Sequence, residues 1–346
     1  MKAMVIPHLS KLDECANPLV LVDLPVPVPC DKEVLIKVSV CGICHTELDE
    51  IEGRTPPACF PMTPGHQAIG EVVETGKAVS KLKVGDRVGV AWIFSACGNC
   101  TYCQSGRENL CADFIATGRD ANGGYAEYMK VLEDFAYKIP SALSNVEAAP
   151  LLCAGAIGYR SLQLTGLKNG QYLGLTGFGA SAHLVLKMVR HSFPKTKVFV
   201  FARNPKERQF ARALGAFWAG ATMDKPPELL DAVIDTTPVW KPVLEALKCL
   251  KPGGRLVVNA IRKENQDRDI LTTLDYTDHL WMEKEIKSVT NVTRKDVEEF
   301  LWLAAEIPIK PHVQEYALKD ANQALLDLKF GFVRGAKVLR ISDHYS

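Results

Sequence analysis

Four cysteines stand close together in the run CGNCTYCQSGRENLC of this 346-residue chain. They are Cys97, Cys100, Cys103 and Cys111, with the spacing C-x2-C-x2-C-x7-C. Thiols this close cannot pair into disulfides of relaxed geometry. Four thiolates at short spacing suit a tetrahedral zinc ion with no open position, which is a structural site. Because such a zinc does no chemistry, the reactive site has to be sought elsewhere in the chain.

Three other residues can form a zinc site with an open position. Cys44 lies in VCGICHTELDE, His66 in TPGHQAIGE and Cys153 in AAPLLCAGAIGY. Two thiolates and an imidazole leave the fourth tetrahedral position for water or substrate. Taken singly each residue is a weak signal, since a lone cysteine is more often a small core residue. The three gain weight only together with the other motifs of the chain.

A glycine pattern typical of dinucleotide binding lies in GLTGFGASAH. Gly177, Gly179 and Ala182 form G-x-G-x-x-A between a predicted strand and a predicted helix, which is the context that the motif requires. Gly177 permits a tight turn, and Gly179 lets the backbone approach a pyrophosphate at the helix N-terminus. The pattern predicts a dinucleotide site, with a purely structural turn as the alternative.

The end of the next strand bears on which dinucleotide binds. An NAD site usually has Asp or Glu there to bind the ribose hydroxyls, whereas this chain reads VFVFARNPKER, with Ala202 and Arg203 in that place. Without a carboxylate a 2′-phosphate is not repelled, and Arg203 offers it a forked cation that Lys206 can assist. We expect a preference for NADP(H). An NAD(H) enzyme, with Arg203 a solvated surface charge, is the alternative.

The elements that must position these residues change in character along the chain. Residues 1–153 contain short apolar alternations separated by Gly and Pro, which predicts a β-rich domain. Over 154–291 strands alternate with helices, which predicts an α/β fold with a doubly wound parallel sheet. Helices are expected at 180–192, 206–216 and 243–254, the last of these ending at a glycine pair. The tail 292–346 has helical stretches in RKDVEEFLWLAAE (294–306) and KDANQALLDLK (319–329), and a closing strand, AKVLRIS.

The composition restricts the function classes. The chain has 41 Lys and Arg against 40 Asp and Glu, so charge does not favour nucleic acid or an anionic membrane as a partner. Its apolar runs are shorter than the roughly 20 residues that span a bilayer, and the N-terminus lacks a signal-peptide core. Eleven cysteines without an export signal indicate reduced thiols and a cytoplasmic location, which argues against a disulfide-rich binding module.

The motifs GICHTE, TPGHQ, the four-cysteine run, PLLCAG and GFGASA follow one another along the chain. With them the chain resembles the zinc-dependent medium-chain alcohol dehydrogenases, and most of all their cinnamyl-alcohol-dehydrogenase-like bacterial branch. The resemblance implies a GroES-like catalytic domain, built from 1–153 and 292–346, that encloses a Rossmann domain at 154–291. It also implies two zinc ions, a homodimer or homotetramer, and reversible oxidation of a small alcohol, in which zinc acidifies the alcohol and the nicotinamide accepts a hydride.

The resemblance also implies roles for single residues. Cys44, His66 and Cys153 match the catalytic zinc ligands, while Cys41 is expected to pack in the core. His45 matches a residue that contacts the cofactor pyrophosphate, and Thr46 the hydroxyl that takes the substrate proton. Trp92 matches an aromatic residue of the pocket wall, with a plain core role as the alternative. Together with Ile51 and Phe94 it suggests an apolar pocket for aliphatic or aromatic substrates.

Three residues depart from the family pattern. Asp49 stands where a histidine commonly ends the proton relay, so it either relays the proton or is a solvated carboxylate. Glu47 replaces an Asp behind the zinc histidine and can still fix the imidazole tautomer. Gln67 replaces a glutamate, which we expect to lower the pKa of zinc-bound water. A catalytically silent dinucleotide-binding protein is the alternative of another class, but such a chain should first lose the ligands of the open site.

Overall fold

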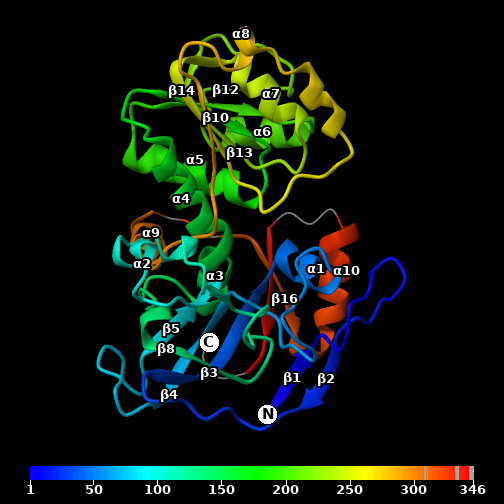
Figure 1. Cartoon of the computed structure of the whole chain (residues 1–346), viewed down its shortest axis with the longest axis vertical. Coiled ribbons are helices and arrows are strands. Elements are labelled where there is room, and N and C mark those ends of the chain that lie inside the picture. Colours follow the sequence, from blue (N-terminus) through cyan, green and yellow to red (C-terminus); the bar gives the residue numbers. More distant parts are fainter. Residues whose placement is uncertain (308, 310, 332–334, 343–346) are drawn as a thin grey trace. The chain divides into compact units, whose positions relative to one another are not determined.

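The computed structural model describes residues 1–307, 309, 311–331 and 335–342. The chain divides into two compact units, Met1–Cys153 with Val292–Ser346, and Ala154–Asn291 (Figure 1). The C-terminal segment therefore belongs to the same unit as the N-terminal half of the chain. None of the described helices is long and apolar enough to cross a membrane.

The first unit is built on a seven-stranded sheet in the order β16-β17-β3-β4-β5-β9, with β8 also pairing with β3. The long strand β3 (Glu33–Ile43) is buried along most of its length, and its apolar side chains form the core of this unit. The closing strand β17 (Ala336–Arg340) runs antiparallel to β3, with Leu339 opposite Cys41. This pairing joins the tail to the first unit. The other strands are β4 (Ala68–Thr75), β5 (Arg87–Val90), β8 (Tyr128–Leu132), β9 (Ala136–Lys138) and β16 (Val313–Ala317).

Short elements surround this sheet and carry the chemistry. Helix α1 (His45–Ile51) directly follows β3, and α3 (Asn145–Pro150) runs into a π-helical turn, Leu151–Gly155. Helix α9 (Arg294–Glu306) has the bounds expected from its amphipathic pattern. The remaining elements of the unit are α2 (Thr101–Gln104), α10 (Ala321–Phe330), β1 (Lys2–Val5), β2 (Val20–Asp23), β6 (Ile93–Ser95) and β7 (Ile115–Ala116).

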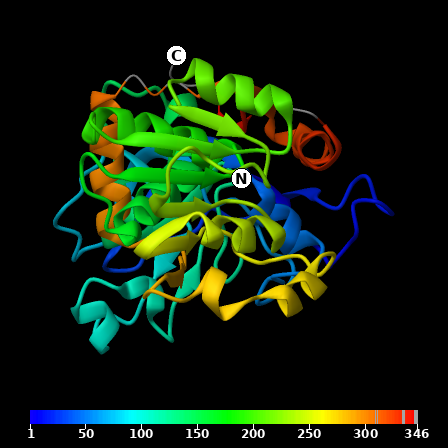
Figure 2. The same cartoon turned by 90° about the horizontal axis from the view of Figure 1, so that it is seen from above.

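The second unit contains a six-stranded sheet in the order β12-β11-β10-β13-β14-β15, and every pair in it is parallel. This is the strand order of the Rossmann fold, and Figure 2 shows helices on both sides of the strands. The central strands are apolar because both of their faces are buried. Their bounds are β10 (Tyr172–Thr176), β11 (Lys197–Phe201), β12 (Trp218–Gly220), β13 (Leu230–Asp235), β14 (Leu250–Val258) and β15 (Glu285–Ser288); the helices are α4 (Ala156–Thr165), α5 (Ala180–Ser192), α6 (Pro205–Ala213), α7 (Lys241–Lys248) and α8 (Tyr276–His279).

The predicted C-terminal end of the helix at 243–254 was wrong. The pattern at 243–254 predicted a helix that ends at the glycine pair, but α7 ends at Lys248 and the pair lies within β14. Leu250 pairs with Leu230 and Arg255 with Ala232, so the glycines sit in a register shift between the two strands. Glycine pairs end helices and also bend strands, and only the pairing partner distinguishes the two.

Candidate active site

Three metal-binding side chains that are far apart in the sequence meet in the first unit. The Sγ atom of Cys44 lies 3.5 Å from Nε2 of His66 and 4.0 Å from Sγ of Cys153. All three ligand atoms lie within 4.8 Å of one another, and they form one of two such groups in the described structure. Cys44 is the N-cap of α1, His66 lies just before β4, and Cys153 lies in the π-helical turn.

These distances fit a tetrahedral zinc ion. Zn–S and Zn–N bonds of the usual length place two sulfurs roughly 3.8 Å apart, and a sulfur and a nitrogen roughly 3.5 Å apart. A hydrogen bond to the Cys153 thiol and burial raise the pKa of Cys44 well above its ordinary value. The Cys44 thiol thus holds its proton until a cation supplies the compensating charge. The donor set leaves one tetrahedral position open, which is the arrangement of a catalytic zinc.

Glu47 supports two of these residues. Its Oε1 lies 2.7 Å from Nδ1 of His66, and its Oε2 accepts the backbone N–H of Cys44 at 2.8 Å. Burial disfavours a charged His66, but the Glu47 carboxylate and Cys44 outweigh it and raise the pKa of His66 well above its usual value. With Nδ1 facing the carboxylate, Nε2 is directed to the metal position, as in carboxylate–histidine–zinc sites. This geometry agrees with the role expected of Glu47.

The sequence reading missed a second buried acid on α1, one turn after Glu47. Glu50 is 0% exposed, and neither of its carboxyl oxygens has a hydrogen-bond partner in the part of the chain that the structure describes. Burial first, and then the neighbouring Glu47, raise the pKa of Glu50 well above its usual value. The i, i+3 spacing of the two glutamates places them on one face of the helix and was the available signal. Burial therefore favours the neutral form of the Glu50 carboxyl group.

The residues expected beside the metal lie in several environments. Thr46 is half-buried next to the ligands, and its N–H donates to Cys44 Sγ at 3.3 Å. His45 is exposed at the start of α1. Asp49 is 3% exposed and forms an ion pair with Arg54, so it is not a solvated carboxylate. A proton relay through Asp49 remains a prediction.

The expected pocket residues differ in exposure. Trp92 is half-buried, its ring centroid lies 5.1 Å from that of Phe114, and the Arg119 guanidinium lies 5.2 Å from its ring. Phe94 packs partly buried against the core of the first unit. The expectation for Ile51 was wrong, because its side chain is fully enclosed in that core and has no surface left for a substrate.

Two further residues behind the ligands are buried. Gln67 is 2% exposed and packs so closely against Gly42 that a Cβ there would lie 2.6 Å from its Oε1. Cys41 is 0% exposed in β3, and it is outside both groups of ligand atoms found among the described residues. Cys41 thus lies in the core, which agrees with the packing role expected of it.

The four-cysteine run forms the second group of converging ligand atoms, which are those of Cys97, Cys100, Cys103 and Cys111. Cys97 Sγ lies 3.9 Å from Cys103 Sγ and 3.5 Å from Cys111 Sγ, which again fits a tetrahedral zinc. Backbone N–H groups of Asn99 and Cys100 lower the pKa of Cys97 to about 7, whereas burial raises that of Cys103 to about 12. Four protein ligands leave no open position, so this group is suited to a structural ion.

The glycine turn in the second unit connects β10 to α5. Gly177 has φ +75°, which favours glycine, and Gly179 is the N-cap of α5. A Cβ added at Gly179 would meet no atom within 4 Å, so its backbone is open to a ligand. Ala182, in the first turn of α5, is 0% exposed. These features fit a dinucleotide pyrophosphate at the N-terminus of α5.

The loop after β11 presents positive charge at the same edge of the sheet. Arg203 and Lys206 are exposed there, and Ala202 is buried. Arg208 donates to the carbonyl oxygens of Ala202 and Arg203, at 2.8 and 2.9 Å, and so fixes the course of the loop. No carboxylate occupies the strand end, in agreement with the sequence VFVFAR.

Comparison with known proteins agrees with this architecture. Residues 30–141 match the model of the alcohol dehydrogenase GroES-like domain. The chain is 43% identical over 330 residues to "Probable alcohol dehydrogenase AdhA" of Mycobacterium tuberculosis, covering 94% of this chain and 93% of that protein.

Two solved structures share the fold across both units. A cinnamyl alcohol dehydrogenase from Sorghum bicolor is 27% identical with a TM-score of 0.80, covering 98% of this chain and 97% of that one. A CAD from Helicobacter pylori, complexed with NADP(H), is 25% identical with a TM-score of 0.84 and covers 99% of both chains. The chain therefore belongs to the alcohol dehydrogenases of the zinc-binding medium-chain family and is an oxidoreductase that acts on the CH–OH group.

Proposed function

We propose that this protein is a zinc-dependent, NADP(H)-preferring dehydrogenase of small primary alcohols, and an aldehyde reductase in the other direction. The observation that carries the proposal is the convergence of Cys44, His66 and Cys153 at the edge lengths of a tetrahedral zinc site. A catalytically silent protein has no need to keep this open ligand set together with the Thr46 hydroxyl.

The chain's own residues have separate roles around the zinc ion, which when bound would act as a Lewis acid on the substrate oxygen. Cys44, His66 and Cys153 hold the ion, and Glu47 orients the imidazole. The Thr46 hydroxyl, next to the ligands, accepts the substrate hydroxyl proton and passes it outward. Asp49 or water continues this path.

The cofactor is held by the second unit. Gly177 and Gly179 admit the pyrophosphate, and Ala182 lets α5 pack closely on the sheet. We expect the exposed His45 to contact the pyrophosphate as well. Arg203 binds the 2′-phosphate, which supports NADP(H) over NAD(H). When bound, the nicotinamide would supply the hydride acceptor.

The substrate class follows from Trp92 and Phe94. Their partly buried aromatic rings favour aliphatic or aromatic chains next to the reacting carbon, such as those of primary alcohols.

Two measurements on the purified full-length chain test the proposal. Metal analysis should find two zinc ions per chain, and an aldehyde screen should give higher kcat/KM with NADPH than with NADH. One zinc per chain together with full turnover would refute the proposed dependence on a second, catalytic zinc. A strong preference for NADH would refute the cofactor assignment alone.

We also propose a homodimer or homotetramer in a reducing, cytoplasmic environment. All four residues of the edge strand β15 are exposed, including Ile286 at 47%, and an exposed edge strand is a ready site for pairing. All eleven cysteines are free thiols, which suits a reducing compartment. Light scattering should find an even number of chains, and a monomer at micromolar concentration would contradict the assembly.

A further inference from the structure

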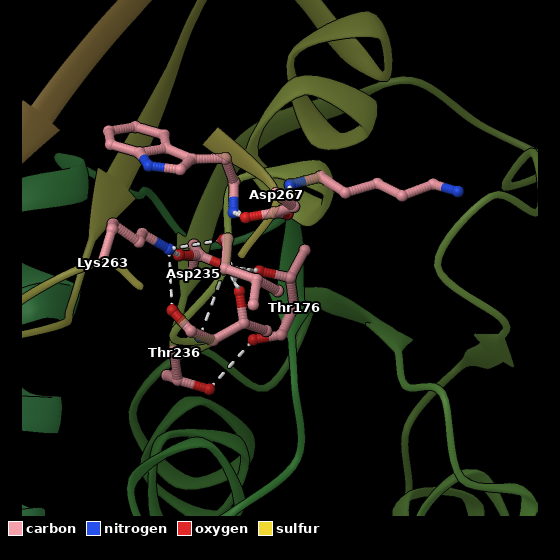
Figure 3. Close-up of polar contacts among 9 residues, drawn as sticks. Thr176, Asp235, Thr236, Lys263 and Asp267 are labelled. Atoms are coloured by element: carbon pink, nitrogen blue, oxygen red, sulfur yellow. Dashed lines mark hydrogen bonds and ion pairs between the residues drawn. The ribbon is translucent and has the colours of Figure 1, made fainter. Parts of the chain in front are cut away.

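A buried polar cluster lies at the carboxyl ends of β10 and β13 in the second unit (Figure 3). Asp235, the last residue of β13, is 0% exposed. Its Oδ1 accepts hydrogen bonds from the hydroxyls of Thr176 at 2.5 Å and Thr237 at 2.7 Å. Its Oδ2 is ion-paired with Lys263, whose side chain is 7% exposed. The carboxylate is thus held in one place by two hydroxyls and one ammonium group.

Lys263 comes from the segment that follows β14 and uses its remaining donors on the backbone. Its Nζ donates to the carbonyl oxygens of Thr237 at 2.7 Å and Val239 at 3.0 Å. A buried ion pair is tolerated only when its partners are well satisfied, and removing one partner leaves an uncompensated charge. Lys263 therefore balances Asp235 and at the same time binds residues 237–239.

A second attachment lies four residues further on. The Asp267 carboxylate accepts the backbone N–H groups of Trp240 at 2.9 Å and Lys241 at 2.8 Å, at the start of α7 (Figure 3). The stretch 263–267 is therefore fastened twice to the stretch that leads from β13 into α7.

The stretch held in this way packs directly against the dinucleotide turn. A Cβ added to Gly177 would lie 2.9 Å from Oγ1 of Thr236 and 3.1 Å from Cγ2 of Thr237. The N–H and hydroxyl of Thr236 both donate to the carbonyl oxygen of Thr176, at 3.0 and 2.9 Å. Asp235 thus places a negative charge beside the turn that receives the diphosphate, at the edge where Rossmann folds bind their ligands.

We propose that Lys263 is a positioning residue for dinucleotide binding, which cancels the charge of Asp235 beside the diphosphate and holds residues 236–239 against the glycine turn. This inference rests on the proposed dinucleotide-dependent function. Lys263 itself is bonded to Asp235 and to backbone carbonyls, so it acts through them and not on the cofactor.

Binding of NADPH to the full-length chain, followed by its fluorescence, tests this role without turnover. Lys263→Met should weaken binding at least about tenfold, because Asp235 then repels the diphosphate without compensation. Asp235→Asn should leave binding unchanged or tighten it, because Lys263 is then an unbalanced cation. The double variant should recover part of this loss, because the charge is balanced again while the bonds of Lys263 to residues 237 and 239 stay lost.

The matched control is Lys251→Met. Lys251 pairs with Asp231 at 2.8 Å in the same unit. These two residues lie at the starts of β14 and β13, away from the strand end that carries Asp235. The loss of Lys251 removes an equal charge, so NADPH binding should change by less than about twofold. A large effect here would show that any lost cation weakens binding, and the proposal would be wrong.

The outcomes separate this inference from the function on which it rests. If the wild type binds neither NADPH nor NADH, the proposed function fails and this inference fails with it. If the wild type binds NADPH but Lys263→Met, Asp235→Asn and the double variant all weaken binding alike, the cluster is merely structural and only the inference fails. If Lys263→Met does not fold, Asp235→Asn decides: weaker binding overturns the charge argument, and equal or tighter binding upholds it.

Discussion

Replacing Arg203 with Asp should change the preferred cofactor. Arg203 is exposed in the loop after β11, where a Rossmann fold meets the adenosine ribose. In the wild type its guanidinium can form charge-assisted hydrogen bonds with a 2′-phosphate. The substitution removes these bonds and puts a carboxylate in their place. That carboxylate repels the phosphate of NADPH and can accept the ribose hydroxyls of NADH.

The size of the effect follows from the exposure of this site. Lost hydrogen bonds to a charged group cost about 1.5–3 kcal/mol. Repulsion of the new carboxylate adds about 1 kcal/mol per unit charge at 4 Å in water. The sum is about 2.5–4 kcal/mol, of which solvent screening at an exposed site should leave about 2–3 kcal/mol. At 1.4 kcal/mol per factor of ten, kcat/KM with NADPH should fall about 30- to 150-fold.

Steady-state rates with one aldehyde and both coenzymes measure the effect. The loss with NADPH should appear mainly in KM, because the 2′-phosphate is remote from the reacting carbon, and NADH should gain modestly. Lys195→Asp is the matched control, since Lys195 is also exposed but precedes β11 at its other end. If Arg203→Asp changes the NADPH/NADH ratio no more than Lys195→Asp does, Arg203 does not select the cofactor.

Three further predictions concern the metal sites and their surroundings. Cys103→Ser should remove one zinc per chain and lower Tm by about 5–10 °C, at ~2–4 °C per kcal/mol of lost stability, while NADPH still binds. Cys153→Ser should remove the other zinc and abolish turnover, while the protein stays folded. Zinc analysis and calorimetry check both variants. The same zinc loss and the same fall in Tm for Cys103→Ser and Cys153→Ser would contradict the division into a structural and a catalytic site. In the zinc-free protein, Glu50→Gln should become more stable than the wild type as pH rises above 4.5, by up to about 1.4 kcal/mol per pH unit. The reason is that the raised pKa of Glu50 in the folded state makes the unfolded chain ionise first, which destabilises the wild type alone. Urea unfolding at pH 5 and 7 should show this gain, and an equal change of unfolding free energy with pH in both proteins would refute it. Gln67→Glu should shift the pH profile of kcat to higher pH, because a carboxylate near the metal weakens its Lewis acidity, and an unmoved profile would show that Gln67 has no such influence.

Much of the local structure could be read from the sequence. The amphipathic patterns gave α5 and α9 their observed bounds, because a helix depends on residues three and four apart. The glycine turn lies between a strand and a helix, as its motif requires. The structural cysteines could be grouped because they span only 97–111 and meet through short loops. In each case the determining contacts lie within a few residues of one another.

Contacts between distant segments depended on the tertiary structure. The family resemblance, and not the spacing, grouped Cys44 with His66 and Cys153, which are 22 and 109 residues away. Ile51 was assigned to the pocket because its apolar side chain suits a pocket and a core equally, and only the packing of α1 distinguishes them.

The sequence by itself determined helices α5 and α9, the glycine turn and the kind of chemistry that the cysteines and histidine can perform. The tertiary structure decided that Glu50 is buried beside Glu47, and that Lys263 pairs with Asp235 across 28 residues. It also decided that the glycine pair at 253–254 lies within a strand, at a register shift. Local sequence patterns reflect the periodicity of a single helix or strand, whereas burial and charge pairing depend on which elements the fold places side by side.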